Sequence, residues 1–237
     1  MRTETVVNDF EYLYLAVRDK EERMYTDAEL LHLPNIDENH RYYSEWQIRK
    51  RSANRFICHL QKNARPLNLL EIGCGNGWLS AKIAGLSNVQ VTGLDINQTE
   101  ISQAKRVFKK QNLKFVYDRF DEHTFGGIAF DIILFAASIA YFPDINEILN
   151  RALNCLAPGG EIHLLDTHFY KPEELDSARD RCLNYYAGLG FPEMYNRYFH
   201  HTLNDMDRFN YKVLLDPRSL INRLGKKEPF YWISISK

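Results

Sequence analysis

The sequence of 237 residues lacks a long hydrophobic run, a charged leader and paired cysteines. No apolar stretch approaches the roughly 20 residues that a membrane-spanning helix needs. The amino-terminal segment mixes acids and bases and has no apolar core of the kind found in a signal peptide. The four cysteines stand far apart, with neither a CxxC pair nor a zinc-ligand spacing. We therefore expect reduced thiols, a cytoplasmic location, no metal and no membrane partner.

The chain also lacks an excess of charge. Thirty basic and 31 acidic residues leave a formal charge of −1, so no overall field draws the protein to nucleic acid. A short basic run, Arg49, Lys50, Arg51 and Arg55, is typical of a solvated helix face. Hydrophobic residues make up 45% of the chain and charged residues 26%, which is the balance of a globular protein with a sizeable core. Nucleic acid is not an expected partner.

What is present is a regular alternation of apolar strands and amphipathic helices after Pro66. Strands are predicted at 67–73, 88–96, 113–118, 130–138 and 160–170, and helices fall between most of them. Such alternation indicates βαβ units and a parallel sheet covered on both faces. Two further strands are predicted at 211–216 and 229–236. Residues 1–65 have helical patterns and no obvious strand.

The first predicted strand runs into a glycine loop, Gly73-Cys74-Gly75-Asn76-Gly77, and then into a helix. Glycine allows a sharp turn or the close approach of a ligand to the backbone. A dinucleotide site needs a third glycine at position 78, where Trp78 stands. A P-loop needs a Lys and a Ser or Thr after its last glycine, and both are missing. The remaining pattern, GxGxG preceded by Glu71, suits a cationic ligand better than a phosphate.

Asp95 ends the second predicted strand. A carboxylate has two acceptor oxygens and can bind both hydroxyls of a ribose from this position. Ile96 follows and is suited to pack on a purine. Asp95 and the glycine loop together indicate a nucleoside site.

Four segments resemble the class I S-adenosylmethionine (SAM)-dependent methyltransferases. They are LEIGCGNGWLS, LDI with Asp95, FVYDRF, and the run from FDIILFAAS through the PGG turn to HLLD, which together cover about residues 68–167. The resemblance implies an α/β, Rossmann-like fold with a seven-stranded, mostly parallel sheet, helices on both faces and an antiparallel last strand. It also implies a helical cap at 1–65, a methyltransferase domain at 66–237 and a substrate insertion at about 171–209. Tyr117 departs from the family pattern, because many relatives have glycine there.

By this resemblance the cofactor is SAM and its product is S-adenosylhomocysteine. The residues expected to bind it come from the glycine loop and from the ends of the strands: Glu71, Gly73, Cys74, Gly75, Asn76, Gly77, Asp95, Ile96, Asp118, Arg119, Phe120, Ala136, Ala137 and Ser138.

Methyl transfer from a sulfonium is an in-line displacement, and a hydroxyl acceptor benefits from a general base. Ligands bind beyond the carboxyl ends of the strands in open α/β sheets. Ser138 and Tyr141 follow the fourth strand, and Asp166, His168 and Tyr170 follow the fifth. We take His168 as the candidate base, with Tyr141 and His200 as further catalytic candidates. The expected substrate contacts are Trp46, Arg49, Tyr170, Tyr195, Tyr198 and His201.

The favoured function is O-methylation of a small-molecule or glycan acceptor, because aromatic side chains suit sugars and flat rings. Two alternatives stay open: a C-methyltransferase acting on a quinone precursor, and a catalytically silent SAM-binding protein. A homodimer is compatible with the sequence, which contains no signal that decides it.

Overall fold

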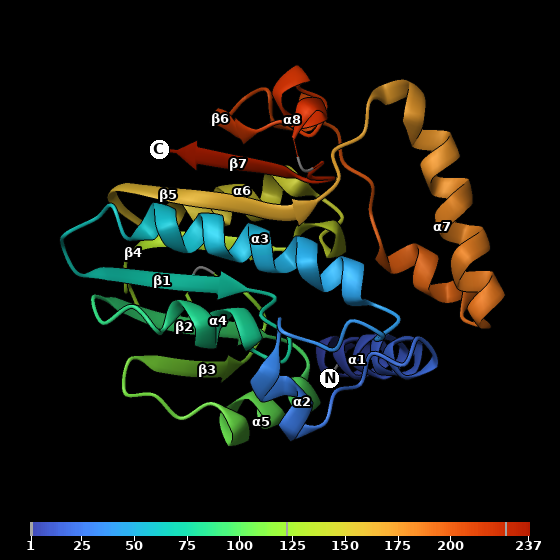
Figure 1. The fold of residues 1–237 in the computed structure, drawn as a ribbon, viewed down its shortest axis with the longest axis horizontal. Helices are drawn as coiled ribbons and strands as arrows, with labels where there is room; N and C mark the ends of the chain where they lie inside the picture. Colours follow the sequence, from blue (N-terminus) through green and yellow to red (C-terminus); the bar gives the residue numbers. More distant parts are fainter. Residues whose placement is uncertain (1, 122, 226) are drawn as a thin grey trace.

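Seven strands form one sheet in the order β3-β2-β1-β4-β5-β7-β6 (Figure 1). A computed structural model describes residues 2–121, 123–225 and 227–237. The strands are β1 (Leu67–Ile72), β2 (Val89–Asp95), β3 (Leu113–Tyr117), β4 (Phe130–Ala136), β5 (Leu156–Thr167), β6 (Asn210–Leu215) and β7 (Tyr231–Ser236). β1 to β5 pair in parallel, whereas β7 is antiparallel to both of its neighbours. This confirms the predicted Rossmann-like sheet with an antiparallel last strand.

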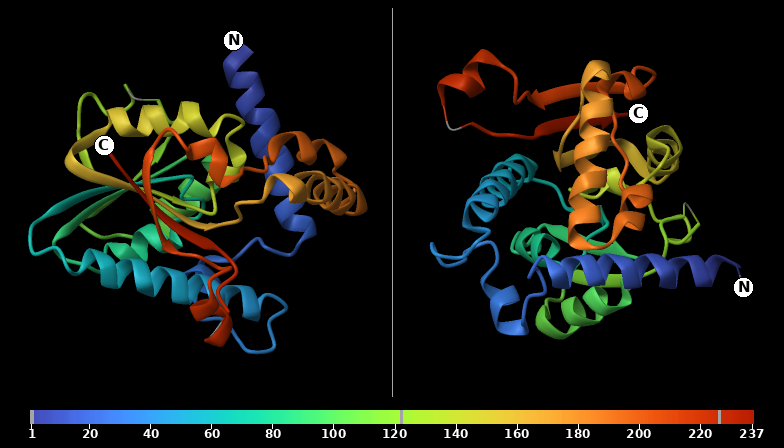
Figure 2. Two further views of the ribbon diagram at one scale, coloured as in Figure 1. Left: turned by 90° about the horizontal axis from the view of Figure 1, so that it is seen from above. Right: turned by 90° about the vertical axis from the view of Figure 1, so that its right-hand side faces the viewer.

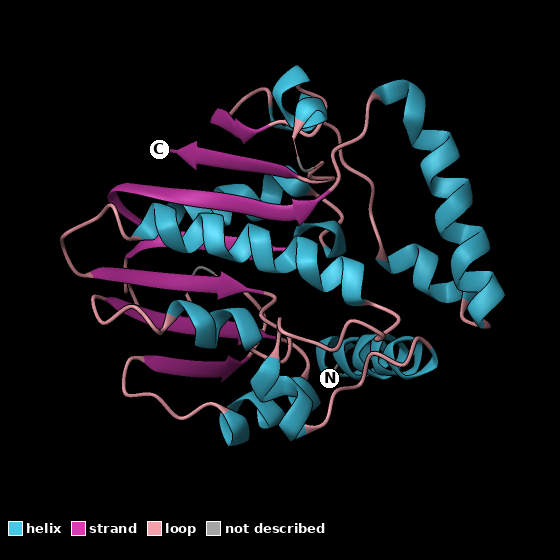
Figure 3. Cartoon of the chain, in the orientation of Figure 1, coloured by secondary structure: helices cyan, strands magenta, loops and turns pink. Residues whose placement is uncertain are grey.

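Helices pack on the sheet through apolar faces that are visible in the sequence. In α6 (Ile145–Asn154), Ile145, Ile148, Leu149 and Ala152 are buried at helical spacing. They join one core cluster, which includes the fully buried Phe135 of β4. A second cluster holds residues of α3 (Tyr43–Leu60), α4 (Trp78–Ile83) and the sheet. Figure 3 shows the helices around the strands.

The amino-terminal helices α1 (Arg2–Lys20), α2 (Asp27–His32) and α3 precede the first strand. Thr26 and Glu29 form a capping box that starts α2. Asp27 of α2 pairs with Arg106 of α5 (Gln98–Val107) at 2.6 Å. α1 lies beyond the arrowheads of β1 and β2, so it faces the carboxyl edge of the sheet (Figure 1).

The segment between β5 and β6 contains α7 (Leu175–Leu189) and the short 3₁₀ turns η2 (Pro172–Glu174), η3 (Pro192–Arg197) and η4 (Leu203–Met206). α7 ends at Gly190, whose φ of 89° is left-handed. Val17 of α1 packs with Tyr186 of α7 and Met194 of η3. Figure 2 shows α1 crossing beside these elements. The short helix α8 (Leu220–Leu224) precedes β7.

Among the described residues, no helix has both the length and the apolar character that crossing a bilayer would require.

Candidate active site

A cavity of about 480 Å³ lies at the carboxyl edge of the sheet. Its walls come from the glycine loop, from the ends of β2, β3, β4 and β5, from the start of α6, and from α1 and α3. This is the edge at which open α/β sheets bind ligands.

The three glycines of the loop all have left-handed backbones, with φ values of 74° at Gly73, 52° at Gly75 and 76° at Gly77. Two of them also have no room for a side chain. A Cβ on Gly73 would lie 2.5 Å from the Cβ of Ser138, and one on Gly77 would lie 2.5 Å from the ring of Phe115. The loop therefore needs glycine for both backbone and packing reasons.

Asp95 holds the glycine loop directly. Its Oδ2 accepts a hydrogen bond from the Gly75 N–H at 2.7 Å, and its Oδ1 accepts one from the Asn97 N–H at 2.8 Å. Each carboxylate oxygen can accept more than one hydrogen bond, so both keep capacity for a ligand. The two features that the sequence singled out thus lie side by side.

Three acidic side chains, Glu71, Asp95 and Glu100, line the cavity near the glycine loop. Burial, reinforced by the nearby Asp95, raises the pKa of Glu71 to about 8 and that of Glu100 to about 7. Burial also raises the pKa of Asp95 itself. Ser80 donates a hydrogen bond to Glu71, which is only 2% exposed. Without a ligand Glu71 therefore favours its neutral form near pH 7, and a cation bound nearby would favour its ionisation.

Aromatic side chains also line the cavity, and two of them, Phe10 and Tyr14, come from α1. We call this group the aromatic half, and the acidic group at the glycine loop the acidic half. The rings of Phe10, Tyr14 and Tyr141 lie 5.9 to 6.0 Å apart, two of the pairs edge to face. Phe142 and Phe199 also line this half. Burial raises the pKa of Tyr141 to about 12, so its hydroxyl stays protonated and serves as a hydrogen-bond donor.

Arg18 brings a positive charge to the aromatic half. Although burial lowers its pKa, the neighbouring Tyr14 and Glu100 raise it overall, so the guanidinium stays charged. Its Nε is buried and has no hydrogen-bond partner in the described part of the chain. Arg18 therefore keeps a donor free for a ligand in the cavity.

The cavity residues of α1 are not among those that the sequence predicts. Phe10, Tyr14 and Arg18 stand four residues apart and so share one face of the helix. This spacing was a usable signal. What it could not reveal is that α1 crosses the sheet edge, which depends on contacts with α7 and η3.

Of the residues expected to bind the cofactor, all except Gly77 line the cavity. Gly77 instead lies beneath it, against Phe115 and Ala104. Trp46, Arg49 and Tyr141 also line the cavity. Trp46 donates to the Tyr25 hydroxyl at 2.7 Å, and Arg49 donates to Glu45 at 3.0 Å.

The histidines expected to take part in catalysis lie outside the cavity lining. His168 is exposed and packs on Phe230, with ring centroids 4.7 Å apart. His200 lies beside Tyr170 at 5.2 Å. β5 ends at Thr167, so the chain leaves the sheet before it reaches these residues. Their positions argue against the prediction that either is the base. Asp166, at the strand end, lines the cavity with a left-handed φ of 54°.

The remaining substrate candidates, Tyr170, Tyr195, Tyr198 and His201, are also outside the lining. The Tyr198 ring packs edge-on against Tyr141 at 5.5 Å. His201 is 5% exposed, and its Nε2 lies 3.1 Å from the Phe142 carbonyl oxygen. Tyr198 and His201 therefore contact the cavity residues Tyr141 and Phe142 and do not line the cavity themselves. Their positions argue against direct substrate contact.

The family profile described as a methyltransferase domain matches residues 69–160. Among curated proteins, the 27-O-demethylrifamycin SV methyltransferase of Amycolatopsis mediterranei (strain S699) is 31% identical over 102 residues, which are 41% of this chain and 38% of that protein. The sterol 24-C-methyltransferase of Debaryomyces hansenii is 24% identical over 165 residues, which are 66% of this chain and 44% of that protein. In these two alignments the chain spans about two fifths of each relative's length.

Solved structures resemble the chain over nearly its whole length. The magnesium protoporphyrin IX methyltransferase of Synechocystis PCC 6803 with bound S-adenosylhomocysteine (SAH) has a TM-score of 0.62 at 17% identity, covering 98% of this chain and 97% of that one. The plantazolicin methyltransferase BpumL in complex with SAH has a TM-score of 0.57 at 16% identity, with full coverage of both chains. These likenesses show the same fold over nearly the whole chain. Residues 69–160 match a methyltransferase domain, and with the motifs around the cavity this match supports a SAM-dependent methyltransferase.

Proposed function

We propose that this protein transfers the methyl group of SAM to an oxygen of a small organic acceptor that has a flat, apolar part. One observation carries the proposal: a single cavity is lined both by acidic side chains at the glycine loop and by aromatic side chains, two of them from α1. The acidic half suits a cationic nucleoside, and the aromatic half suits a ring system.

The residues of the acidic half fit SAM. Asp95 would bind the ribose hydroxyls, and Glu71 and Glu100 would face the positive charges of the cofactor. Asp118 and Phe120 would contact the adenine, as the family resemblance implies. When bound, SAM supplies a methyl group that its sulfonium already activates, so the protein has to align the acceptor and exclude water.

We assign Asp166 as the acceptor-side base in place of His168. Burial raises the pKa of Asp166, although Arg49 nearby lowers it, and a carboxylate with a raised pKa is a better base near neutral pH. In the transfer, the acceptor oxygen forms its bond to the methyl carbon while the C–S bond breaks and its electron pair goes to sulfur. The hydroxyl proton passes to Asp166.

The aromatic half sets the class of acceptor. Phe10, Tyr14 and Tyr141 offer ring edges and faces, and Arg18 offers an unpaired N–H. This combination favours a phenol or a ring-bearing carboxylic acid over a free sugar, because guanidinium groups bind oxyanions well.

C-methylation is the second candidate, and the names of several relatives favour it, since they are sterol 24-C-methyltransferases. A silent SAM-binding protein is the third candidate, and the experiment below separates it from both enzymes.

The test incubates the purified chain with SAM and a panel of phenols, ring-bearing carboxylic acids, sugars and sterols, and measures SAH by mass spectrometry. We expect SAH together with an O-methylated phenol or acid. Asp166→Asn should lower turnover at least tenfold and leave SAM affinity unchanged, whereas Asp121→Asn, an exposed acid outside the cavity, should change neither. Methylation at carbon would favour the second candidate. SAM binding without turnover on the whole panel would overturn the proposal.

A further inference from the structure

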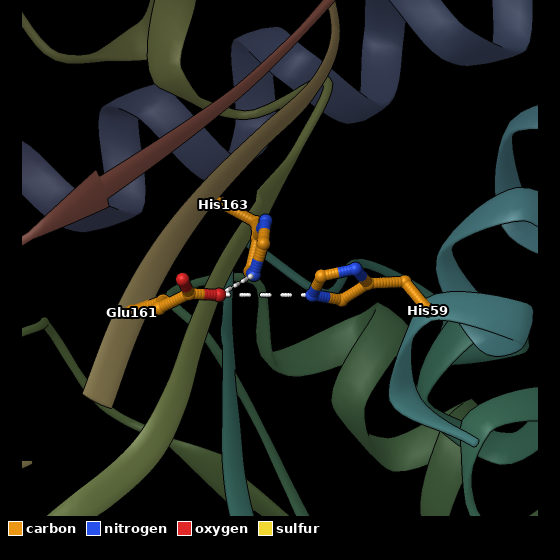
Figure 4. A group of neighbouring side chains, drawn as sticks. All are labelled: His59, Glu161 and His163. Atoms are coloured by element: carbon orange, nitrogen blue, oxygen red, sulfur yellow. Dashed lines mark ion pairs between the residues drawn. The ribbon is translucent and has the colours of Figure 1, made fainter. Parts of the chain in front are cut away.

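A second cluster of chemically reactive side chains lies apart from the cavity. His59 near the end of α3 meets Glu161 and His163 of β5, and the ligand atoms of all three lie within 4.8 Å of one another. Figure 4 shows the two imidazole rings directed at one oxygen of Glu161. Because Glu161 and His163 are two residues apart on a strand, both side chains point to the same face of the sheet.

The spacing of the donor atoms is close to that of a tetrahedral zinc site. Zinc bonds to His nitrogen and carboxylate oxygen are about 2.0–2.2 Å long, so two ligand atoms lie roughly 3.3–3.5 Å apart. In this structure the Nε2 of His163 is 3.2 Å from Oε2 of Glu161, and the Nε2 of His59 is 3.6 Å from the same oxygen. These two pairs are therefore close to the ligand distance, whereas the third pair, between the two histidines, lies within 4.8 Å and would have to reach the same distance.

A second observation points to a ligand. The side chain of His163 is fully buried, yet its Nε2 has no well-aligned hydrogen bond in the described part of the chain. A buried polar atom whose contact is poorly aligned is costly, and this one is directed at Glu161 inside the cluster. The side chains of His59 and Glu161 are 27% and 38% exposed, which leaves a path for an ion.

We propose that His59, Glu161 and His163 form a zinc-binding site, with water as the fourth ligand. The site would fix the end of α3 to β5. His59 follows Arg49 by ten residues, so the site lies about 15 Å along the helix from the cavity wall. We therefore assign it a stabilising role that is separate from methyl transfer.

Trp232 sets a condition on binding. Its indole N–H donates to Nδ1 of His163 at 3.1 Å, which places the proton of the neutral imidazole on Nε2. Zinc at Nε2 requires that this proton leave and that Nδ1 take one up, so the N–H of Trp232 opposes the metal-bound form. Removal of this donor should strengthen zinc binding.

The test titrates Zn²⁺ into the chelator-treated full chain, purified without a histidine tag, and follows heat, thermal unfolding and tryptophan emission. We expect one zinc ion per chain and a higher Tm. His59→Gln and Glu161→Gln should each weaken binding at least tenfold. His32→Gln, which changes an exposed histidine on α2, should have no effect. Trp232→Phe should tighten binding about threefold or more and abolish the emission change.

The proposed zinc site would be overturned if the parent chain bound no zinc, or if neither His59→Gln nor Glu161→Gln weakened binding. It would also be overturned if a folded Trp232→Phe variant bound zinc more weakly than the parent chain. Circular dichroism of each metal-free variant distinguishes lost ligands from lost folding.

Discussion

Asp95 connects the backbone of the glycine loop to the cavity, because its two oxygens accept hydrogen bonds from Gly75 and Asn97. A side chain in this position can serve the fold and a ligand at once. Substitution of Asp95 should therefore change both the stability of the fold and the affinity for the cofactor.

We expect Asp95→Asn to weaken SAM binding by about 1–3 kcal/mol, because an amide offers one acceptor where the carboxylate offers two charged ones. Isothermal titration calorimetry measures the loss. Asp121→Asn is the control, since Asp121 is exposed and outside the cavity. Equal SAM affinity in Asp95→Asn and the parent chain would remove Asp95 from the proposed ribose site.

Glu71 should make stability depend on pH. Burial raises its pKa from 4.5 to about 8, so the folded chain keeps a proton that the unfolded chain releases above pH 4.5. Its contribution to the free energy of unfolding is therefore complete below about pH 4.5 and is lost as pH rises to about 8.

Glu71→Gln should flatten this fall, because glutamine does not ionise. Chemical denaturation at several pH values between 5 and 8.5 tests the expectation, with the exposed Glu38→Gln as the control. Parallel pH profiles for Glu71→Gln and the parent chain would contradict it.

The start of α4 packs closely against strand β3 because the residue between them is a glycine. Gly77 is the amino-terminal cap of α4, and its missing Cβ leaves room for the ring of Phe115 in β3. This explains why a predicted cofactor residue lies outside the cavity lining and still matters to the loop.

Gly77→Ala should destabilise the fold by about 1–3 kcal/mol more than Gly159→Ala. The two glycines have similar φ values, 76° and 73°, but only Gly77 has a neighbour in the way. The comparison therefore separates steric overlap from backbone strain. Urea unfolding curves provide the measurement, and equal losses in the two variants would show that packing at Gly77 is unimportant.

α1 covers the aromatic half of the cavity through Phe10, Tyr14 and Arg18. We expect SAH to slow hydrogen exchange of the amides between residues 10 and 18, because a ligand in contact with the helix restricts its opening. α7 provides the internal comparison, since its residues do not line the cavity. Unchanged exchange in α1 at saturating SAH would show that the helix does not respond to the cofactor.

At the scale of the whole molecule, charge is balanced locally as well as in total. Arg51 and Arg55 of the basic run pair with Glu228 at 2.7 and 2.9 Å, and Arg49 pairs with Glu45. Little positive charge of this basic run therefore remains unpaired to attract the phosphate backbone of a nucleic acid.

We therefore expect no electrostatic binding of RNA or DNA, which would weaken as the salt concentration rises. Fluorescence anisotropy with a labelled single strand and a labelled duplex at 20 and 200 mM salt would test this expectation. Tight binding at low salt that weakens steeply at high salt would reopen nucleic acid as an acceptor.

Local patterns in the sequence are sufficient to predict the parallel sheet and the placement of Asp95 beside the glycine loop, because short segments encode periodicity and glycine backbones. The antiparallel last strand followed from the family resemblance. The tertiary structure decided the acceptor side. It brought Phe10, Tyr14 and Arg18 over the sheet edge, placed Asp166 in the cavity and left His168 outside. Those positions depend on how distant elements pack together, which no local pattern specifies.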